Sequence, residues 1–285
     1  MMDSEQLVNR LVDLIRQAST TLPQDIRNAL RSSAEKSPAG SSARTILATI
    51  EENAALAQTR CVPACQDTGT PAFWFDLPDG TPTLPIRDAM REAMNRATQA
   101  GYLRLNVILV PEERQEPHNY APGSPVVHFR FLPHGSTPRA TLLLKGGGSE
   151  NQSRQYSLPD HALSAGRDLE GVRKCVLDAI WKAQGNGCSP GIIGVCIGGE
   201  RAGAYACAKE QLLRPLDDHN PIPELDNLET RLLEEGNRLG IGPMGLGGFP
   251  TLLGVKIGTL PRLPASYFVT VAYNCWACRR ATVSL

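Results

Sequence analysis

The 285-residue sequence lacks several features that would each indicate a definite class of protein. It has no apolar run long enough to cross a bilayer, so we expect no membrane span. Basic and acidic side chains number 29 each, and this zero net charge favours neither nucleic acid nor an anionic membrane as a partner. Its start carries acidic residues and periodic leucines rather than a basic, apolar targeting segment. We therefore expect a cytoplasmic protein.

Disulfides are also not expected, although the chain has eight cysteines. A chain of this length without a secretion signal is not typical of a disulfide scaffold. Cys175, Cys196 and Cys207 lie in apolar periodic segments, which predicts small buried side chains. The remaining cysteines lie in loops or in a C-x-x-C pair, where reduced thiols are typical metal ligands.

Helices and strands are both predicted, but without a regular βαβ alternation. Apolar periodicity predicts helices over 4–18, 23–36, 44–58, 86–100, 160–183 and 224–242. Strand-like segments occupy 73–77, 103–110, 126–132, 140–148, 252–260 and 266–274. We expect the segments between 103 and 145 to be neighbours in one sheet.

This mixture predicts an α+β fold, with N-terminal helices packed against a mixed sheet and its flanking helices. We expect one domain over 1–285, in which 1–58 is mainly helical and 59–285 holds the loops that carry the chemistry.

Two loops combine glycine with polar side chains. In Cys65-Gln66-Asp67-Thr68-Gly69-Thr70 a thiol precedes an amide, a carboxylate and a hydroxyl, which indicates either a metal ligand beside a substrate or an Asx-type turn. Residues 145–151 read KGGGSEN after a strand, and their glycines permit either close backbone approach to an anion or a flexible turn. The P-loop pattern is absent, so this loop does not indicate nucleotide binding.

Two further cysteines stand in unusual settings. Cys188 lies in GNGCSPG, and Cys275 begins CWAC. A zinc site built from Cys61, Cys65, Cys275 and Cys278 is possible, but roughly 200 residues separate its two pairs, unlike a compact zinc module. Three loop cysteines instead favour a [4Fe–4S] cluster in which one iron has no protein ligand and acts as a Lewis acid.

Five motifs in this chain resemble the class I (iron–sulfur) fumarate hydratase and L-tartrate dehydratase family, specifically its alpha subunit or N-terminal half. In family order they are PACQDTGT (63–70), KGGGSEN (145–151), CSPGIIGVCIGG (188–199), LEEGNRLGIGPMGLGG (233–248) and CWACRR (275–280). The resemblance implies a [4Fe–4S] hydro-lyase whose cluster ligands are Cys65, Cys188 and Cys275.

The resemblance also implies a set of substrate-binding residues. Gln66, Asp67, Arg104 and the backbone of Gly147 and Gly148 are expected near the substrate. The planar guanidinium of Arg104 suits a dicarboxylate. Gln66 and Asp67 are the catalytic candidates, and Asp67 is suited to position the leaving water or to act as acid or base.

The sequence departs from the family pattern at two positions. Ser189 replaces the first proline of the usual C-P-P. Leu263 stands twelve residues before Cys275, where relatives commonly carry histidine, and this keeps open a non-catalytic metal-binding homologue.

The expected function is reversible hydration of fumarate to L-malate, with L-tartrate dehydration as the alternative. In the family a beta subunit or C-terminal domain completes the site. We therefore expect a beta subunit partner, in a heterotetramer or larger assembly, and no nucleic-acid or membrane partner.

Overall fold

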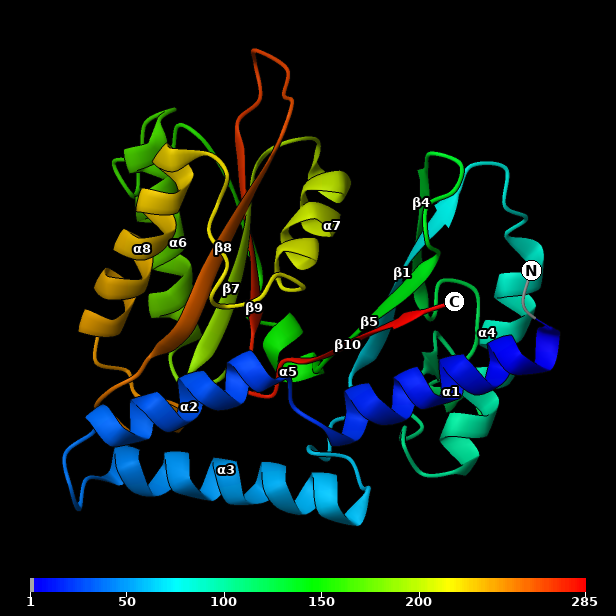
Figure 1. Ribbon diagram of the computed structural model, residues 1–285. Coiled ribbons are helices and arrows are strands. Elements are labelled where there is room, and N and C mark those ends of the chain that lie inside the picture. The colour runs from blue at the N-terminus through cyan, green and yellow to red at the C-terminus, as the bar shows by residue number, and fades with distance from the viewer. Residues whose placement is uncertain (1–2) are drawn as a thin grey trace. The chain divides into compact units, whose positions relative to one another are not determined.

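The computed structural model describes residues 3–285, whose contacts group into two compact units (Figure 1). The first unit comprises 3–23, 52–147 and 279–285, and the second comprises Gln24–Glu51 and Gly148–Cys278. Each unit has its own sheet and its own apolar core. The single-domain expectation stays a prediction.

The first unit contains a four-stranded mixed sheet in the order β10-β5-β1-β4. Its central strand β1 pairs antiparallel with β5 and parallel with β4, and β10 pairs antiparallel with β5. The strands are β1 (Thr70–Pro78), β4 (Val126–Leu132), β5 (Arg139–Lys145) and β10 (Arg279–Ser284), and β2 (Ile108–Leu109) and β3 (Arg114–Gln115) form a separate hairpin.

Two helices build the core of the first unit with this sheet. They are α1 (Ser4–Thr20) and α4 (Leu84–Gln99). Leu11 and Ile15, one helical turn apart on α1, are fully buried. Phe73 and Phe75 on β1 are also fully buried and stack with their ring centroids 5.8 Å apart. The apolar face that the periodicity of α1 predicts thus packs in the core of the first unit.

The second unit contains a mixed sheet in the order β6-β9-β7-β8, with α6 and α8 on one face and α7 on the other (Figure 1). The strands are β6 (Arg154–Ser157), β7 (Gly191–Gly198), β8 (Leu252–Leu260) and β9 (Phe268–Asn274). The helices are α2 (Gln24–Lys36), α6 (Leu169–Ala183), α7 (Arg201–Gln211) and α8 (Pro223–Arg238), with the 3-10 turn η1 (Pro243–Gly245). α3 (Ser42–Arg60) and α5 (Gly147–Glu150) run across the boundaries of the two units.

The predicted α+β class is confirmed, and the predicted strands over 126–132 and 252–260 coincide with β4 and β8. The expectation that the strands between 103 and 145 are neighbours is wrong. β1 lies between β4 and β5, because its nearly continuous burial suits the centre of the sheet. Segment 103–110 is mostly loop, and its only strand is β2.

The helix predicted from 160 begins only at Leu169. Asp160 and Ala165 exchange backbone hydrogen bonds of 2.9 and 2.8 Å, which close a turn. Asp168 then caps the helix, since its carboxylate accepts a 2.7 Å hydrogen bond from the Gly171 amide.

The core cysteines follow the sequence prediction in two cases of three. Cys175 and Cys196 are fully buried, whereas Cys207 is only half-buried. Burial raises the pKa of Cys175 to about 12, so its thiol stays protonated and behaves as a small apolar side chain.

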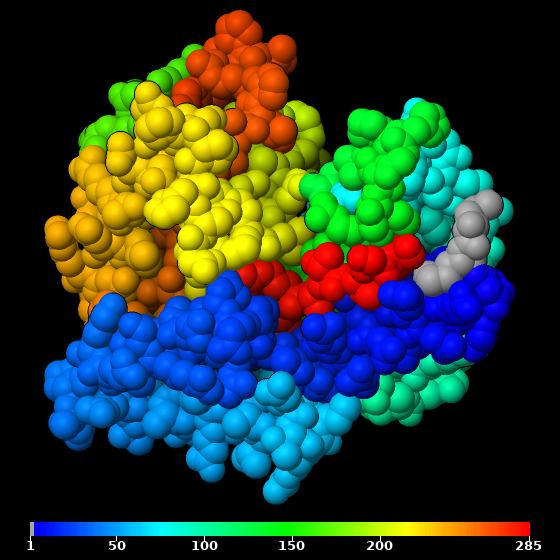
Figure 2. Space-filling model, in the orientation of Figure 1, coloured from blue at the N-terminus to red at the C-terminus, as the bar shows by residue number. Residues whose placement is uncertain are grey.

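Leu263 lies in the turn between β8 and β9, orange-red in Figure 2, and is 73% exposed. No helix among residues 3–285 is long and apolar enough to cross a membrane.

Candidate active site

The carboxylate of Asp67 lies between two segments of the first unit. Oδ1 accepts a hydrogen bond from the Gly69 amide at 2.9 Å, as in an Asx-type turn. Oδ2 accepts one from the Gly147 amide at 2.7 Å. The Asx-type turn is therefore present, and the same carboxylate joins this loop to the glycine-rich segment after β5. The interpretation of Cys65 as a metal ligand beside a substrate stays a prediction.

Glycines leave the space that this contact requires. Gly69 has φ +80°, and a Cβ there would lie 2.8 Å from the backbone carbon of Lys145. At Gly146 a Cβ would lie 2.9 Å from Oδ2 of Asp67. Gly146 is thus required by close packing against the Asp67 carboxylate, and Gly69 by close packing against the Lys145 backbone.

A buried cation lies near the same glycine-rich segment. Arg279, the first residue of β10, is 1% exposed, and its Nε and Nη1 atoms have no hydrogen-bond partner among residues 3–285. A Cβ added at Gly146 would lie 3.8 Å from Nη2 of Arg279 and 2.9 Å from Oδ2 of Asp67. Sequence reasoning passed over this residue, although the two arginines directly after the CWAC segment were visible in the motif.

Arg104 lies in the loop that leads to β2. Its Nη1 donates to the backbone oxygen of Gln66 at 3.0 Å, and both side chains are exposed. The first unit therefore brings together four of the predicted substrate-binding residues, Gln66, Asp67, Arg104 and Gly147. Gly148 belongs to the second unit, where a Cβ would lie 3.9 Å from the backbone oxygen of Asn186.

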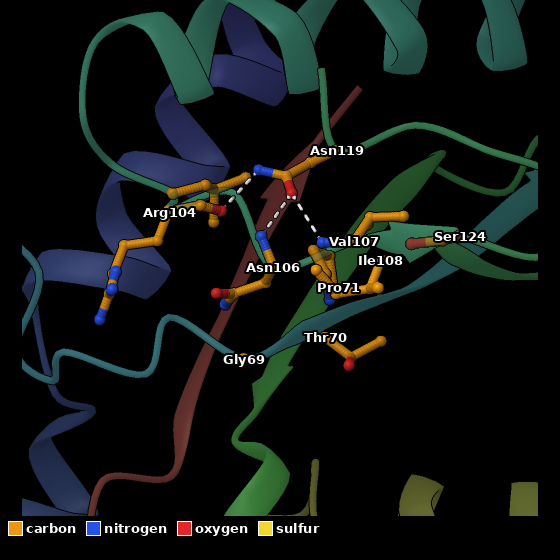
Figure 3. Close-up of a pocket in the computed structure, with 10 residues that line it drawn as sticks. Gly69, Thr70, Pro71, Arg104, Asn106, Val107, Ile108, Asn119 and Ser124 are labelled. Carbon is orange, nitrogen blue, oxygen red and sulfur yellow. Dashed lines mark hydrogen bonds between the residues drawn. The ribbon is translucent and has the colours of Figure 1, made fainter. Parts of the chain in front are cut away.

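A cavity of about 240 Å³ opens next to Arg104 (Figure 3). Its polar lining comes from the start of β1, the loop after α4 and the residues before β4. The lining includes Gly69, Thr70, Arg104, Asn106, Asn119 and Ser124. Amide, hydroxyl and guanidinium groups of this kind suit a small polar anion.

Cys188 and Cys275 lie on adjoining loops of the second unit. The Trp276 amide donates to the backbone oxygen of Cys188 at 3.3 Å, and both thiols are half-buried. Burial raises the pKa of Tyr273, and the nearby Cys275 and Cys188 raise it further. The two thiols therefore share one environment around the Tyr273 phenol.

The path of the Cys188 loop is set by glycines that pack on Tyr273. A Cβ at Gly187 would lie 2.2 Å from the ring, and one at Gly191 would lie 2.5 Å from the hydroxyl oxygen. Cys188 itself has φ +53°, an unusual backbone conformation for a residue that is not glycine.

Ser189 anchors the same loop to the segment around η1. Its hydroxyl donates to the Gly242 backbone oxygen at 2.6 Å and accepts from the Gly245 amide at 3.1 Å. Its backbone oxygen accepts a 2.8 Å hydrogen bond from the Met244 amide. Ser189, noted as a departure from the usual proline, thus bonds to the LGIGPMGLGG segment.

The two loop thiols of the second unit, Cys188 and Cys275, suit an iron–sulfur cluster, because thiolate sulfur is a soft ligand and both residues are only half-buried. Cys65, the third predicted ligand, is half-buried in the first unit. Cys278 differs from all three, since it is fully buried and its thiol lies 3.9 Å from the Leu212 backbone oxygen. Within residues 3–285 no group of three or more His, Cys, Asp or Glu side chains is arranged as a metal site.

Comparison with known proteins assigns the family. The family model described as "Fumarate hydratase (Fumerase)" matches residues 8–284. A Geobacillus stearothermophilus protein named "Putative fumarate hydratase class I" is 46% identical over 284 residues, which cover 99% of this chain and 55% of that protein. The chain thus spans about half the length of this relative.

Two further relatives are close to this chain in length. The Methanocaldococcus jannaschii protein named "Putative L(+)-tartrate dehydratase subunit alpha" is 35% identical, with 95% of this chain and 94% of that protein covered. The "L(+)-tartrate dehydratase subunit alpha" of Escherichia coli strain UTI89 is 32% identical, with 99% of this chain and 92% of that protein covered.

Proposed function

Because this chain belongs to the fumarate hydratase family, we propose that it is the alpha-type part of a hydro-lyase that interconverts fumarate and L-malate together with a beta-type partner. Fumarate hydratases and tartrate dehydratases are both carbon–oxygen lyases. The observation that carries the proposal is the arrangement around Asp67. Its carboxylate accepts from the Gly69 and Gly147 amides, and the Arg104 guanidinium donates to the backbone oxygen of the preceding residue, Gln66.

Each of these groups has a role that its chemistry supports. Arg104 binds one carboxylate of the substrate, because a planar guanidinium matches the two carboxylate oxygens. The Gln66 side chain, which is exposed, donates to or accepts from the substrate. Asp67 positions the water that leaves or adds, and its two backbone hydrogen bonds fix the carboxylate for this task.

The cofactor in this proposal is a [4Fe–4S] cluster bound by Cys65, Cys188 and Cys275. When bound, such a cluster supplies a Lewis-acidic iron that has no protein ligand and assists the loss of hydroxide. The adjoining loops of Cys188 and Cys275 support this ligand set.

The partner in this proposal is a beta subunit, in a heterotetramer or a larger assembly. The names of the Methanocaldococcus and Escherichia relatives, which are subunits alpha, support a separate partner chain. The Geobacillus relative is nearly twice as long as the matched region, which suits a second module in the same chain.

Anaerobic reconstitution tests the proposal directly. The chain and its beta-type partner are co-expressed, treated with ferrous iron and sulfide, and assayed for fumarate formation from L-malate. We expect the wild-type complex to show cluster absorbance and turnover, and Cys188→Ala to lose both. Cys207→Ala is the control and should retain both, because Cys207 is a half-buried cysteine outside the predicted ligand set. A complete cluster in Cys188→Ala would contradict the assignment.

L-tartrate is the second candidate substrate, favoured by the names of two relatives that this chain covers almost fully. Turnover of L-malate and L-tartrate by one preparation separates the two. A non-catalytic homologue, which the Leu263 position left open, would instead turn over neither substrate and would hold metal without acid-labile sulfide.

A further inference from the structure

Asn119 is a buried asparagine whose side chain makes four hydrogen bonds. Those to Arg104, Asn106 and Val107 are drawn in Figure 3. Oδ1 accepts from the amides of Asn106 and Val107 at 2.9 and 3.3 Å. Nδ2 donates to the Arg104 backbone oxygen at 2.7 Å and to the Thr98 hydroxyl at 3.0 Å. The residue is 2% exposed, and its bonds use the full capacity of the amide group.

Side-chain hydrogen bonds take the place of strand pairing over most of this segment. The sequence predicted a strand over 103–110, but the amides of residues 104, 106 and 107 and the carbonyl of residue 104 bond to side chains. The Thr68 hydroxyl accepts from the Arg104 amide at 3.0 Å and from the Asn106 side chain at 2.9 Å. Arg104 is therefore held through its carbonyl by Asn119 and through its amide by the residue that follows Asp67.

We propose that Asn119 is a positioning residue, which fixes the backbone of Arg104 and thereby sets how tightly the site binds a substrate carboxylate. This inference rests on the proposed function, in which Arg104 binds the dicarboxylate. Asn119 acts only through the loop, because its four bonds go to neighbouring residues of the first unit.

The chemistry of this position favours asparagine over its nearest substitutes. Its φ of +54° is one that glycine, asparagine and aspartate tolerate best. Glycine would keep the backbone and remove every side-chain bond. Aspartate would keep the acceptor for the two amides but would turn a negative oxygen toward the Arg104 carbonyl, where Nδ2 now donates.

The first test compares kinetics in the reconstituted complex with the beta-type partner. We expect Asn119→Asp to raise KM for the dicarboxylate about tenfold with kcat changed less than about twofold. A misplaced Arg104 guanidinium would weaken binding of the substrate and of the transition state equally, which raises KM and leaves kcat unchanged. Asn220→Asp is the matched control: Asn220 is also buried and donates to the Ile257 backbone oxygen at 2.8 Å, but it belongs to the second unit. We expect its KM to stay at the wild-type value even where its melting temperature falls.

The second test needs no activity and uses hydrogen exchange of the full chain. We expect Asn119→Gly to speed exchange of the Asn106 and Val107 amides at least about tenfold, while amides in β1 keep their protection. Unchanged exchange at both positions, or an unchanged KM in Asn119→Asp, would overturn the inference. If wild-type protein turns over no dicarboxylate, the proposed function fails, and the exchange result still decides whether Asn119 holds the loop.

Discussion

Oδ2 of Asp67 accepts a 2.7 Å hydrogen bond from the amide of Gly147, a residue 80 positions further along the chain. This contact connects the loop before β1 with the segment after β5, two antiparallel neighbours in the sheet. The pairing of β1 with β5 thus brings the two motifs together, and the Asp67 carboxylate connects the residues just outside the paired strands.

Asp67→Asn is expected to lower kcat at least about 100-fold, because it removes a carboxylate from the reacting centre and can present an N–H to the Gly147 donor. Steady-state turnover of L-malate by the reconstituted complex measures the effect. Asp79→Asn is the control, since Asp79 also accepts from a glycine amide, Gly80 at 3.0 Å, but is exposed on another loop. Equal losses in the two variants would contradict a specific role for Asp67.

Gly69→Ala is expected to destabilise the chain by about 3 kcal/mol or more, since it adds a backbone clash to the cost of a positive φ. Gly101→Ala separates the two causes. Gly101 has nearly the same φ, +78°, but a Cβ there would meet nothing within 4 Å. We expect the control to cost only about 1–2 kcal/mol, as measured by urea unfolding. Similar losses of unfolding free energy in Gly69→Ala and Gly101→Ala would show that the Lys145 backbone can move to accommodate the added Cβ.

Arg279→Met is expected to keep or raise the unfolding free energy while it lowers activity. A buried donor without a partner costs about 1–3 kcal/mol, so an apolar side chain of similar length relieves that cost. Activity is expected to fall because a positive charge close to Gly146, which packs on the Asp67 carboxylate, is lost. Thermal unfolding and turnover are measured together, with the half-buried neighbour Arg280→Met as the control. A variant that loses stability would contradict this account of Arg279.

Asp76 is expected to make stability depend on pH in the acid range. Burial raises its pKa, but the guanidiniums of Arg130 and Arg139, at 2.6 and 2.7 Å, outweigh burial and hold that pKa below its usual value. The carboxylate therefore stabilises the fold fully above about pH 4, and this contribution is lost as the pH falls through the folded-state pKa.

Urea unfolding between pH 7 and pH 3 tests this dependence. We expect wild-type protein to lose about 1 kcal/mol more over this range than Asp76→Asn, which cannot titrate. Asp13→Asn is the control, because Asp13 is 67% exposed and pairs with Arg16 at the surface, where such pairs contribute little. If Asp76→Asn lost more unfolding free energy than wild type between pH 7 and pH 3, this account of Asp76 would be contradicted.

Sequence periodicity located most helices and strands. α1 buries the apolar face that its periodicity predicts, β8 is buried almost continuously, and β4 alternates in sequence although most of its residues are only half-buried. Periodicity failed at 103–110, where the residues have strand propensity but Asn119 and Thr68 satisfy the backbone. Such bonds come from residues distant in sequence, which periodicity does not report. Asp67 lies in one of the motifs, and Arg104 was implied by the family resemblance, because both carry charged groups that suit a dicarboxylate site. Asn119 was missed because it lies in no motif and only supports neighbouring residues.

The ring of Tyr273 packs against both glycines that flank the Cys188 segment, and only Asn274 separates it from Cys275 along the chain. One aromatic ring therefore fixes the path of the Cys188 loop and also stands two residues before Cys275 in the chain. A substitution that changes the size of that ring is expected to move the Cys188 loop, although it alters neither cysteine.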